Sequence, residues 1–230
     1  EKVLDLPCVI CYEAPAYAPE VHPLPALDGK PFTFGCINRI EKISDKAIGL
    51  WGQIMAALPE SQLLLKDHKL GDAKIKEGIL RRLAAVGITP ERVQLAGGSP
   101  HAEHLKIYHN VDLGLDPFPH GGGVSTAEAL WMGVPVVTLL GQTITSRLSA
   151  SISTALEMRD WIAVSDADYV RIAVVAARDL PRLVGLRQGL RAQFAASAVG
   201  DAKRYTAVVE RAYRSMWQRW CRHSPLSDFG

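Results

Sequence analysis

Two short segments of the sequence carry groups that are well suited to binding phosphate. The first is residues 38–42, where an amide and two cations occur together: Asn38, Arg39 and Lys42. The second, residues 116–126, holds three consecutive glycines before an expected helix; its candidate contacts are Gly123, Val124, Ser125 and Thr126. Amides at a helix start bind anions, and glycines let the backbone approach closely. We predict a diphosphate site with Lys42 as its cation; in the alternative, the glycines only form a turn and Lys42 is a surface charge.

A carboxylate and two histidines occur where they could contact the rest of a nucleotide. Glu128 lies one helical turn beyond the glycines, where it could accept hydrogen bonds from ribose hydroxyls or merely be stabilised by the helix dipole. His101 and His104 lie three residues apart, but a zinc site would need a third ligand and Glu103 lies on another helix face. We therefore expect no metal. We expect His104 to hydrogen-bond a nucleotide or phosphate, with a surface histidine as the alternative.

Neither of the usual nucleotide-binding fingerprints is present. The sequence contains no GxxxxGK[ST] motif, and no GxGxxG motif follows the first expected strand. This disfavours a dehydrogenase that transfers hydride.

Composition and charge bear on whether the protein is globular, binds nucleic acid or enters a membrane. The 230 residues are 48% hydrophobic and 22% charged, which is typical of a globular protein, and the net charge is 26 − 24 = +2. From Arg171 to His223, eleven Lys and Arg stand against three Asp and Glu. The basic residues are almost all arginines spread over helical segments, without interleaved aromatic stacking platforms, so solvated helix faces are favoured over a nucleic-acid groove. No apolar stretch approaches the roughly 18 residues of a membrane span. We expect neither nucleic acid nor a membrane as partner.

The four cysteines are too few for a disulfide scaffold in a chain of this length. Cys8 and Cys11 form one CxxC in an apolar run, and no second pair follows at zinc-ribbon spacing, so we interpret them as buried thiols. A reducing, cytoplasmic compartment is the expected location.

From residue 32 onward, short apolar runs alternate with segments of helical periodicity. Strands are predicted near 32–36, 63–65, 92–95, 111–115, 134–138 and 161–164. Helices are predicted near 45–55, 73–86, 101–109, 127–132, 146–156, 166–179, 181–196 and 202–221. The alternation predicts an α/β fold: a Rossmann-like parallel sheet with flanking helices in the strand order 3-2-1-4-5-6, and then an all-helical C-terminal tail. Ligands of such sheets bind beyond strands one and four, where both phosphate-suited segments begin.

The two ends of the chain differ from this pattern. Residues 1–30 are rich in proline, which predicts an extended connector with at most one strand, over Val9–Tyr12. The last helix carries an apolar stripe with arginines opposite: Tyr205, Val208, Val209, Ala212, Tyr213, Met216, Trp217 and Trp220. We expect this stripe to pack partly on this domain and partly, near Trp217 and Trp220, on residues 1–30 or on a lobe outside this chain; a membrane or partner surface is the alternative.

Several motifs, in order from about residue 5 to 222, resemble the O-GlcNAc transferase family. The closest resemblance is to its bacterial tetratricopeptide-repeat members and their SPINDLY-like plant relatives. The matching strings are Phe34–Ile43, His104-Leu105 with Tyr108, Asp112–Pro119, Glu128–Val136, Ser146-Arg147 and Tyr213–Trp217.

The resemblance implies the C-terminal lobe of a GT-B glycosyltransferase that inverts the sugar, needs no metal and acts on Ser or Thr of polypeptides. UDP-GlcNAc is the expected donor, although SPINDLY-like relatives use GDP-fucose. It also implies a division of the chain: 1–30 as a connector from an N-terminal catalytic lobe outside this chain, 31–200 as the donor lobe, 201–222 as a helix crossing to the other lobe, and 223–230 as a tail. The polypeptide acceptor would bind upstream repeats.

The resemblance also implies roles for single residues. Lys42 matches the family's lysine on the donor pyrophosphate, and Arg39 stands where many members have Gln or Asn. The nucleotide contacts would come from Ser99 and His101 through their backbones at the base, His104 at the nucleotide, and Glu128 at the ribose. Gly123, Val124 and Ser125 match the phosphate-binding run, with Val124-Ser125 in place of the family's usual pair of threonines. No residue of the chain matches a general base.

Two other functions stay open at this point. One is a GT-B sugar-nucleotide epimerase or a transferase that builds glycans. The other is a catalytically silent module that binds nucleotides or serves as a scaffold.

Overall fold

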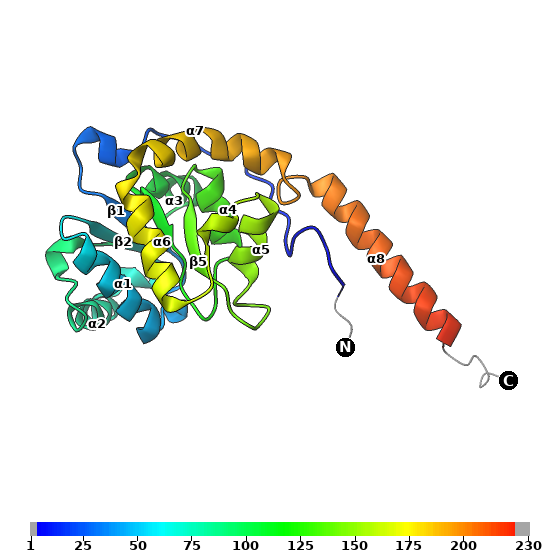
Figure 1. The fold of residues 1–230 in the computed structure, drawn as a ribbon, viewed down its shortest axis with the longest axis horizontal. Helices are drawn as coiled ribbons and strands as arrows, with labels where there is room; N and C mark the ends of the chain where they lie inside the picture. Colours follow the sequence, from blue (N-terminus) through cyan, green and yellow to red (C-terminus); the bar gives the residue numbers. More distant parts are fainter. Residues whose placement is uncertain (1–3, 224–230) are drawn as a thin grey trace.

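The computed structural model describes residues 4–223 and shows one parallel sheet covered by helices (Figure 1). The strands are β1 (Thr33–Ile37), β2 (Gln62–Lys66), β3 (Val93–Ala96), β4 (Leu113–Leu115), β5 (Val136–Leu139) and β6 (Ile162–Ala163). Their order is β3-β2-β1-β4-β5-β6, and every pair is parallel. The predicted α/β class and strand order are thereby confirmed. The order reverses between β1 and β4, which places a crevice beyond the carboxyl ends of these two strands.

Two glycines form the centre of the sheet at this point. Gly35 of β1 lies in register with Gly114 of β4. A Cβ atom on Gly35 would lie 2.6 Å from Cγ1 of Val111, so no larger residue fits without displacing that side chain. All five residues of β1 are buried, as expected for a strand with helices on both faces.

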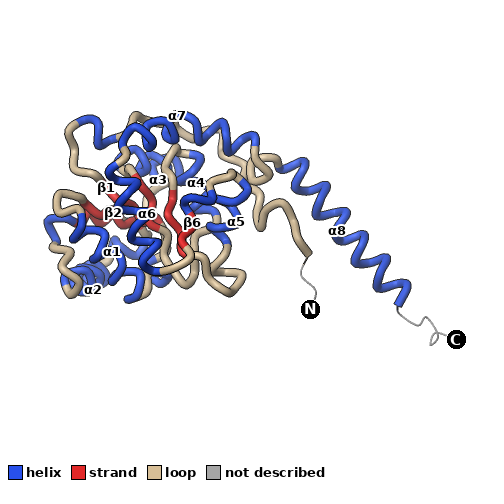
Figure 2. The backbone as a smooth tube through the Cα atoms, in the orientation of Figure 1, coloured by secondary structure: helices blue, strands red, loops and turns tan. Residues whose placement is uncertain are grey.

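The helices are α1 (Asp45–Ala57), α2 (Ala73–Ala84), α3 (His101–Lys106), α4 (Val124–Trp131), α5 (Leu148–Ala155), α6 (Asp166–Arg178), α7 (Leu180–Ala196) and α8 (Ala202–His223). Helices α1 and α6 pack together on one face of the sheet, around the fully buried Trp51. Helices α3 and α4 contribute to a second core that includes Leu105 and Met132. The backbone trace in Figure 2 shows these helical layers with the strands between them.

Some bounds differ from the predicted ones for local reasons. Helix α4 begins at Val124, three residues earlier than predicted, because Gly123 already serves as its N-cap. Helix α3 ends at Lys106, and the chain continues as a 3₁₀ turn over Ile107–Asn110. These shifts lengthen the helix that starts at the glycines and shorten the one that carries the two histidines.

The segment before the sheet forms no strand in its described part. The one strand considered for Val9–Tyr12 does not form: this run lies beside α7 and its flanking loop, with the amide of Tyr12 donating to the carbonyl of Val199 at 2.9 Å. Arg191 of α7 donates to the carbonyl of Pro19 at 2.6 Å. The segment is thus held by hydrogen bonds to helical arginines and loops instead of by a strand ladder.

Arg187 of α7 is a cation inside this packing. Its side chain is 2% exposed, and its guanidinium donates to three carbonyls: His22 at 2.9 Å, Val111 at 2.7 Å and Tyr108 at 2.8 Å. Burial lowers the pKa of Arg187 to about 10. One side chain thereby ties together the N-terminal segment, the 3₁₀ turn after α3 and the start of β4.

Helix α8 extends away from the rest of the molecule (Figure 1). Trp217 and Trp220 are 63% and 57% exposed and stack on each other, with ring centroids 5.2 Å apart. Within the described residues they do not pack on residues 1–30, so that option of the expectation is wrong; packing on a lobe outside this chain stays a prediction. The start of the helix meets this segment, where the hydroxyl of Tyr205 donates to the carbonyl of Val9 at 3.2 Å. None of the helices within 4–223 is long and apolar enough to cross a membrane.

This arrangement predicts that the two halves of α8 differ in their effect on stability. A chain ending at Val209 should keep its melting temperature within about 2 °C, because the residues removed from the described helix are mostly exposed. A chain ending at Asp201 should lose about 1–2 kcal/mol, since it also loses the Tyr205 contact and the half-buried residues 207–209. Calorimetry of both chains tests this, and an equal loss in both would contradict it.

Candidate nucleotide-binding site

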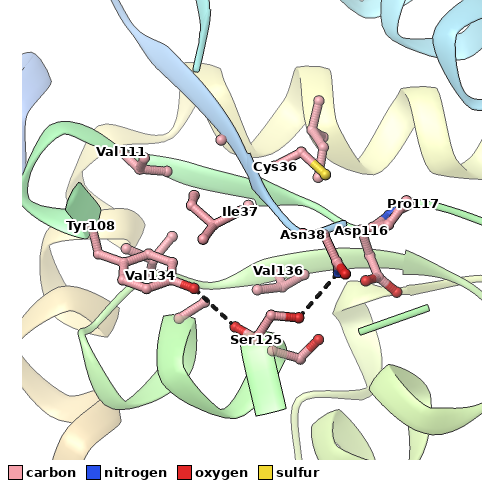
Figure 3. Close-up of a pocket in the computed structure, with 15 residues that line it drawn as sticks. Cys36, Ile37, Asn38, Tyr108, Val111, Asp116, Pro117, Ser125, Val134 and Val136 are labelled. Carbon is pink, nitrogen blue, oxygen red and sulfur yellow. Dashed lines mark hydrogen bonds between the residues drawn. The ribbon is translucent and has the colours of Figure 1, made fainter. Parts of the chain in front are cut away.

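The two phosphate-suited segments meet beyond the ends of β1 and β4. The ammonium of Lys42 donates to the carbonyl of Gly121 at 2.9 Å, and the amide of Asn38 donates to Oγ of Ser125 at 3.0 Å. Figure 3 shows the latter bond together with the hydroxyl of Tyr108, which donates to the carbonyl of Ser125 at 3.1 Å. The start of α4 is thus anchored from both sides of the crevice.

Lys42 is the half-buried cation of this crevice. Burial lowers the pKa of Lys42, the Asp116 carboxylate opposes this effect, and Arg39 adds to it, so that the net shift is downward. Arg39 itself is exposed at the rim. An anion placed beside Lys42 would favour the charged ammonium and reverse the shift.

Helix α4 directs free backbone amides into the same space. Its first intrahelical bond runs from the amide of Ala127 to the carbonyl of Gly123, so the amides of residues 124–126 lack helical partners. Among these residues, Val124 is 57% exposed and Ser125 is half-buried, whereas Thr126 is buried. The positive end of the helix dipole lies at the same place.

Thr126 offers a ligand fewer hydrogen-bonding groups than the sequence suggests. Its side chain is buried, and its hydroxyl pairs with that of Ser149 at 2.9 Å. The hydroxyl therefore faces the core, and only the amide of Thr126 is placed to meet a ligand. Ser125 keeps a half-buried side chain at the surface of the crevice.

A buried carboxylate shapes the glycine-rich loop. Asp116, directly after β4, accepts hydrogen bonds from the amide of Gly122 at 2.7 Å and from Oγ1 of Thr138 at 2.8 Å. The hydroxyl of Ser149 donates to the carbonyl of Gly122 at 2.9 Å. Burial raises the pKa of Asp116 despite these bonds. Asp116 and Ser149 therefore hold the glycine-rich loop in place without a ligand.

Glu128 and the two histidines form one cluster. Nε2 of His101 lies 2.7 Å from Oε1 of Glu128, and Nε2 of His104 lies 3.4 Å from Oε2. Burial would raise the pKa of Glu128, but hydrogen bonds from His104 and His101 outweigh it and hold the pKa below its usual value. The carboxylate is thus ionised at neutral pH. Its stabilising contribution is present above the unfolded-state pKa and disappears as the pH falls through the folded-state pKa.

Ser99 lies near this cluster. It is exposed just before α3 and lines the same pocket as His104 and Glu128. The described part of the chain contains no group of three or more His, Cys, Asp or Glu residues that could hold a metal ion.

Sequence reasoning missed several residues of the site. The hydroxyl of Tyr17 lies 2.9 Å from Nδ1 of His101, although Tyr17 belongs to the N-terminal segment, and no local pattern announces this contact. Lys66 lines the pocket from the end of β2. Asp116 had a usable signal, because an acid directly after a buried strand lies at the carboxyl edge where ligands bind.

The fold is that of a Rossmann-like lobe of a GT-B glycosyltransferase. The chain belongs to glycosyltransferase family 41, whose profile matches residues 25–209. It is 34% identical over 226 residues to a protein of Petunia hybrida described as a probable UDP-N-acetylglucosamine–peptide N-acetylglucosaminyltransferase SPINDLY, and 33% identical to the Arabidopsis thaliana protein of that description. Each alignment covers 96% of this chain and 24% of the relative, so the chain spans about a quarter of the length of these curated relatives.

Solved structures agree with this assignment. A mutant O-GlcNAc transferase of Thermobaculum terrenum superposes with a TM-score of 0.84 at 34% identity, covering 91% of this chain and 40% of that one. A sucrose-phosphate synthase of Thermosynechococcus elongatus has a TM-score of 0.59 at 15% identity over 88% of this chain and 50% of its own, which supports the fold alone.

The geometry of Glu128 predicts how the site distinguishes ribose from deoxyribose. If the carboxylate accepts hydrogen bonds from ribose hydroxyls, 2′-deoxy-UDP should bind about tenfold more weakly than UDP, and this difference should vanish in Glu128→Ala. Glu103→Ala is the matched control, since Glu103 is exposed and pairs with Lys106. Equal discrimination by wild type and Glu128→Ala, measured by calorimetry, would remove Glu128 from the ribose site.

Proposed function

We propose that residues 31–200 bind the nucleotide-sugar donor of a protein O-glycosyltransferase that transfers GlcNAc from UDP-GlcNAc to Ser or Thr of polypeptides. The observation that carries the proposal is the convergence of Lys42 and the start of α4 at one crevice, in a chain that belongs to glycosyltransferase family 41. The printed descriptions of the SPINDLY relatives, which name UDP-N-acetylglucosamine and peptide, support the donor and the acceptor.

In this proposal the chain stabilises the leaving group. The acceptor hydroxyl attacks the anomeric carbon from the face opposite the diphosphate, the bond between that carbon and the diphosphate oxygen breaks, and the sugar is inverted. Lys42 and the amides of 124–126 would stabilise the charge that develops on the departing diphosphate. These groups supply fixed positive charge where other transferases use a metal ion, so we propose a metal-independent reaction. The proton of the acceptor hydroxyl would pass to a base outside the residues identified here.

The other contacts would hold the nucleoside. Glu128 would bind the ribose, with His104 beside it, and Ser99 and His101 would border the base. Asn38, Arg39, Gly123, Val124, Ser125 and Thr126 would surround the diphosphate, with Thr126 acting through its amide. GDP-fucose is the competing donor, because none of these proposed contacts is with the sugar that is transferred.

The rest of the parent protein completes the proposal. Residues 1–30 would connect the lobe to an N-terminal catalytic lobe, 201–222 would cross to that lobe, and 223–230 would be a tail. The acceptor would bind upstream repeats; the greater length of the relatives supports such additional parts. A cytoplasmic location is part of the proposal, and the four unpaired cysteines support it.

Two assays test the proposal. The 230-residue chain should be stabilised against heating by UDP and by UDP-GlcNAc. The parent protein should transfer labelled GlcNAc to a polypeptide, with full activity in the presence of a chelator. Donor binding without any turnover by the parent protein would favour the catalytically silent module instead. Stabilisation by GDP-fucose and not by UDP or UDP-GlcNAc would make GDP-fucose the donor.

A further inference from the structure

A buried lysine at the end of β2 has no role in the site described so far. Lys66 is 6% exposed, and its ammonium donates to the carbonyl of Gly97 at 2.7 Å. Within residues 4–223 no carboxylate forms an ion pair with it, and burial lowers the pKa of this lysine. A buried cation without a counter-charge costs stability, and such groups concentrate at functional sites.

Lys66 borders the same crevice from the second strand away from β4. It lines one pocket together with Asn38, Ser99, His104 and Glu128. Neighbouring strands lie about 4.8 Å apart, so β2 lies roughly 10 Å from β4, with β1 between them. A diphosphate held above β1 and β4, with its ribose at Glu128, therefore directs its base toward the ends of β2 and β3.

We propose that Lys66 determines which nucleobase the site accepts, by donating a hydrogen bond to a ring carbonyl of the base. This inference rests on the proposed function, since it needs a nucleoside diphosphate in the crevice. One ammonium proton is engaged by Gly97, and two are left for a ligand. Uracil and guanine carry a carbonyl oxygen where cytosine and adenine carry an amino group, which is itself a donor. The site should thus select uridine or guanosine diphosphates over their cytidine and adenosine counterparts.

UDP and CDP make the sharpest comparison, because their bases differ at one position: an oxygen in uracil and an amino group in cytosine. A site built to hydrogen-bond one group rejects an analogue that cannot pair with it. The full 230-residue chain should bind UDP at least tenfold more tightly than CDP, as measured by calorimetry. In Lys66→Met, which keeps the length of the side chain without its charge, the ratio of the two affinities should fall at least tenfold toward one. Lys66→Arg should keep the preference for UDP.

The control is Lys69→Met, three residues further along, where the lysine is exposed and pairs with Glu41. This variant should leave the UDP-to-CDP ratio unchanged. If Lys66→Met weakens UDP and CDP equally, Lys66 acts only by holding the Gly97 loop, and the inference is wrong. Equal binding of UDP and CDP by the wild type also overturns it, even if Lys66→Met does not fold. Failure of the wild type to bind any of UDP, GDP, CDP or ADP would instead refute the proposed function.

Discussion

Replacing Lys42 with alanine should weaken the binding of UDP by about 1.5–3 kcal/mol, which is roughly a 10- to 150-fold loss of affinity. The reason is that Lys42 is half-buried, so its charge acts on a bound diphosphate with less screening by water than a surface lysine would. The carbonyl of Gly121, which Lys42 contacts without ligand, cannot replace an anionic partner. In the parent protein, the rate of sugar transfer should fall further, since charge on the diphosphate grows as it departs.

Calorimetry with UDP and with uridine distinguishes an effect on diphosphate binding from an effect on nucleoside binding. Uridine lacks phosphate, so its affinity should change little in Lys42→Ala. Lys46→Ala is the matched control, because Lys46 is exposed on the next turn of the chain and pairs with Asp166. Unchanged UDP affinity in Lys42→Ala would show that Lys42 does not contact the diphosphate.

Replacing Arg187 with alanine should reduce the free energy of unfolding by about 3–5 kcal/mol. Three carbonyls lose the Arg187 guanidinium at once, and two of these contacts, at Tyr108 and Val111, are fully buried. The carbonyl of Tyr108 keeps a longer bond from the amide of Val111, at 3.3 Å. Each buried carbonyl left without a donor costs about 1–3 kcal/mol, partly recovered where water enters. The loss should loosen the 3₁₀ turn that carries Tyr108, and with it the anchor of the α4 start.

Urea unfolding of two variants tests this prediction. Arg182→Ala removes an arginine of the same helix that is exposed and pairs with Asp160, and it should cost less than about 1 kcal/mol. Arg187→Lys should lie between wild type and Arg187→Ala, because an ammonium cannot reach three carbonyls in the planar geometry of a guanidinium. A loss of less than 1 kcal/mol in Arg187→Ala would mean that water replaces all three bonds.

The sheet and the phosphate end of the site were predictable from the sequence for a simple reason. Both depend on local patterns, and the position of loops in a parallel sheet follows from strand order alone. Once β1 and β4 are recognised, the segments containing Lys42 and the glycines must meet, and the structure brings them within 2.9 Å. At this end of the site, the structure changes only the first residue of α4, because Gly123 is its N-cap.

The remaining contacts depend on tertiary packing that no local pattern encodes. Tyr17 reaches His101 across 84 positions of the chain, from a segment without regular structure. Thr126 resembles any hydroxyl at a helix start, and only the neighbouring Ser149 turns it inward. The stripe of α8 has the periodicity of a packed helix, yet periodicity cannot specify the surface that would cover Trp217 and Trp220.

A crystal structure of the 230-residue chain with UDP tests the central claim most directly. The account predicts diphosphate oxygens within about 3 Å of the ammonium of Lys42 and of backbone amides in 124–126, with the ribose at Glu128. Electron density for the diphosphate anywhere else on the molecule, with Lys42 still bound only to Gly121, would contradict it.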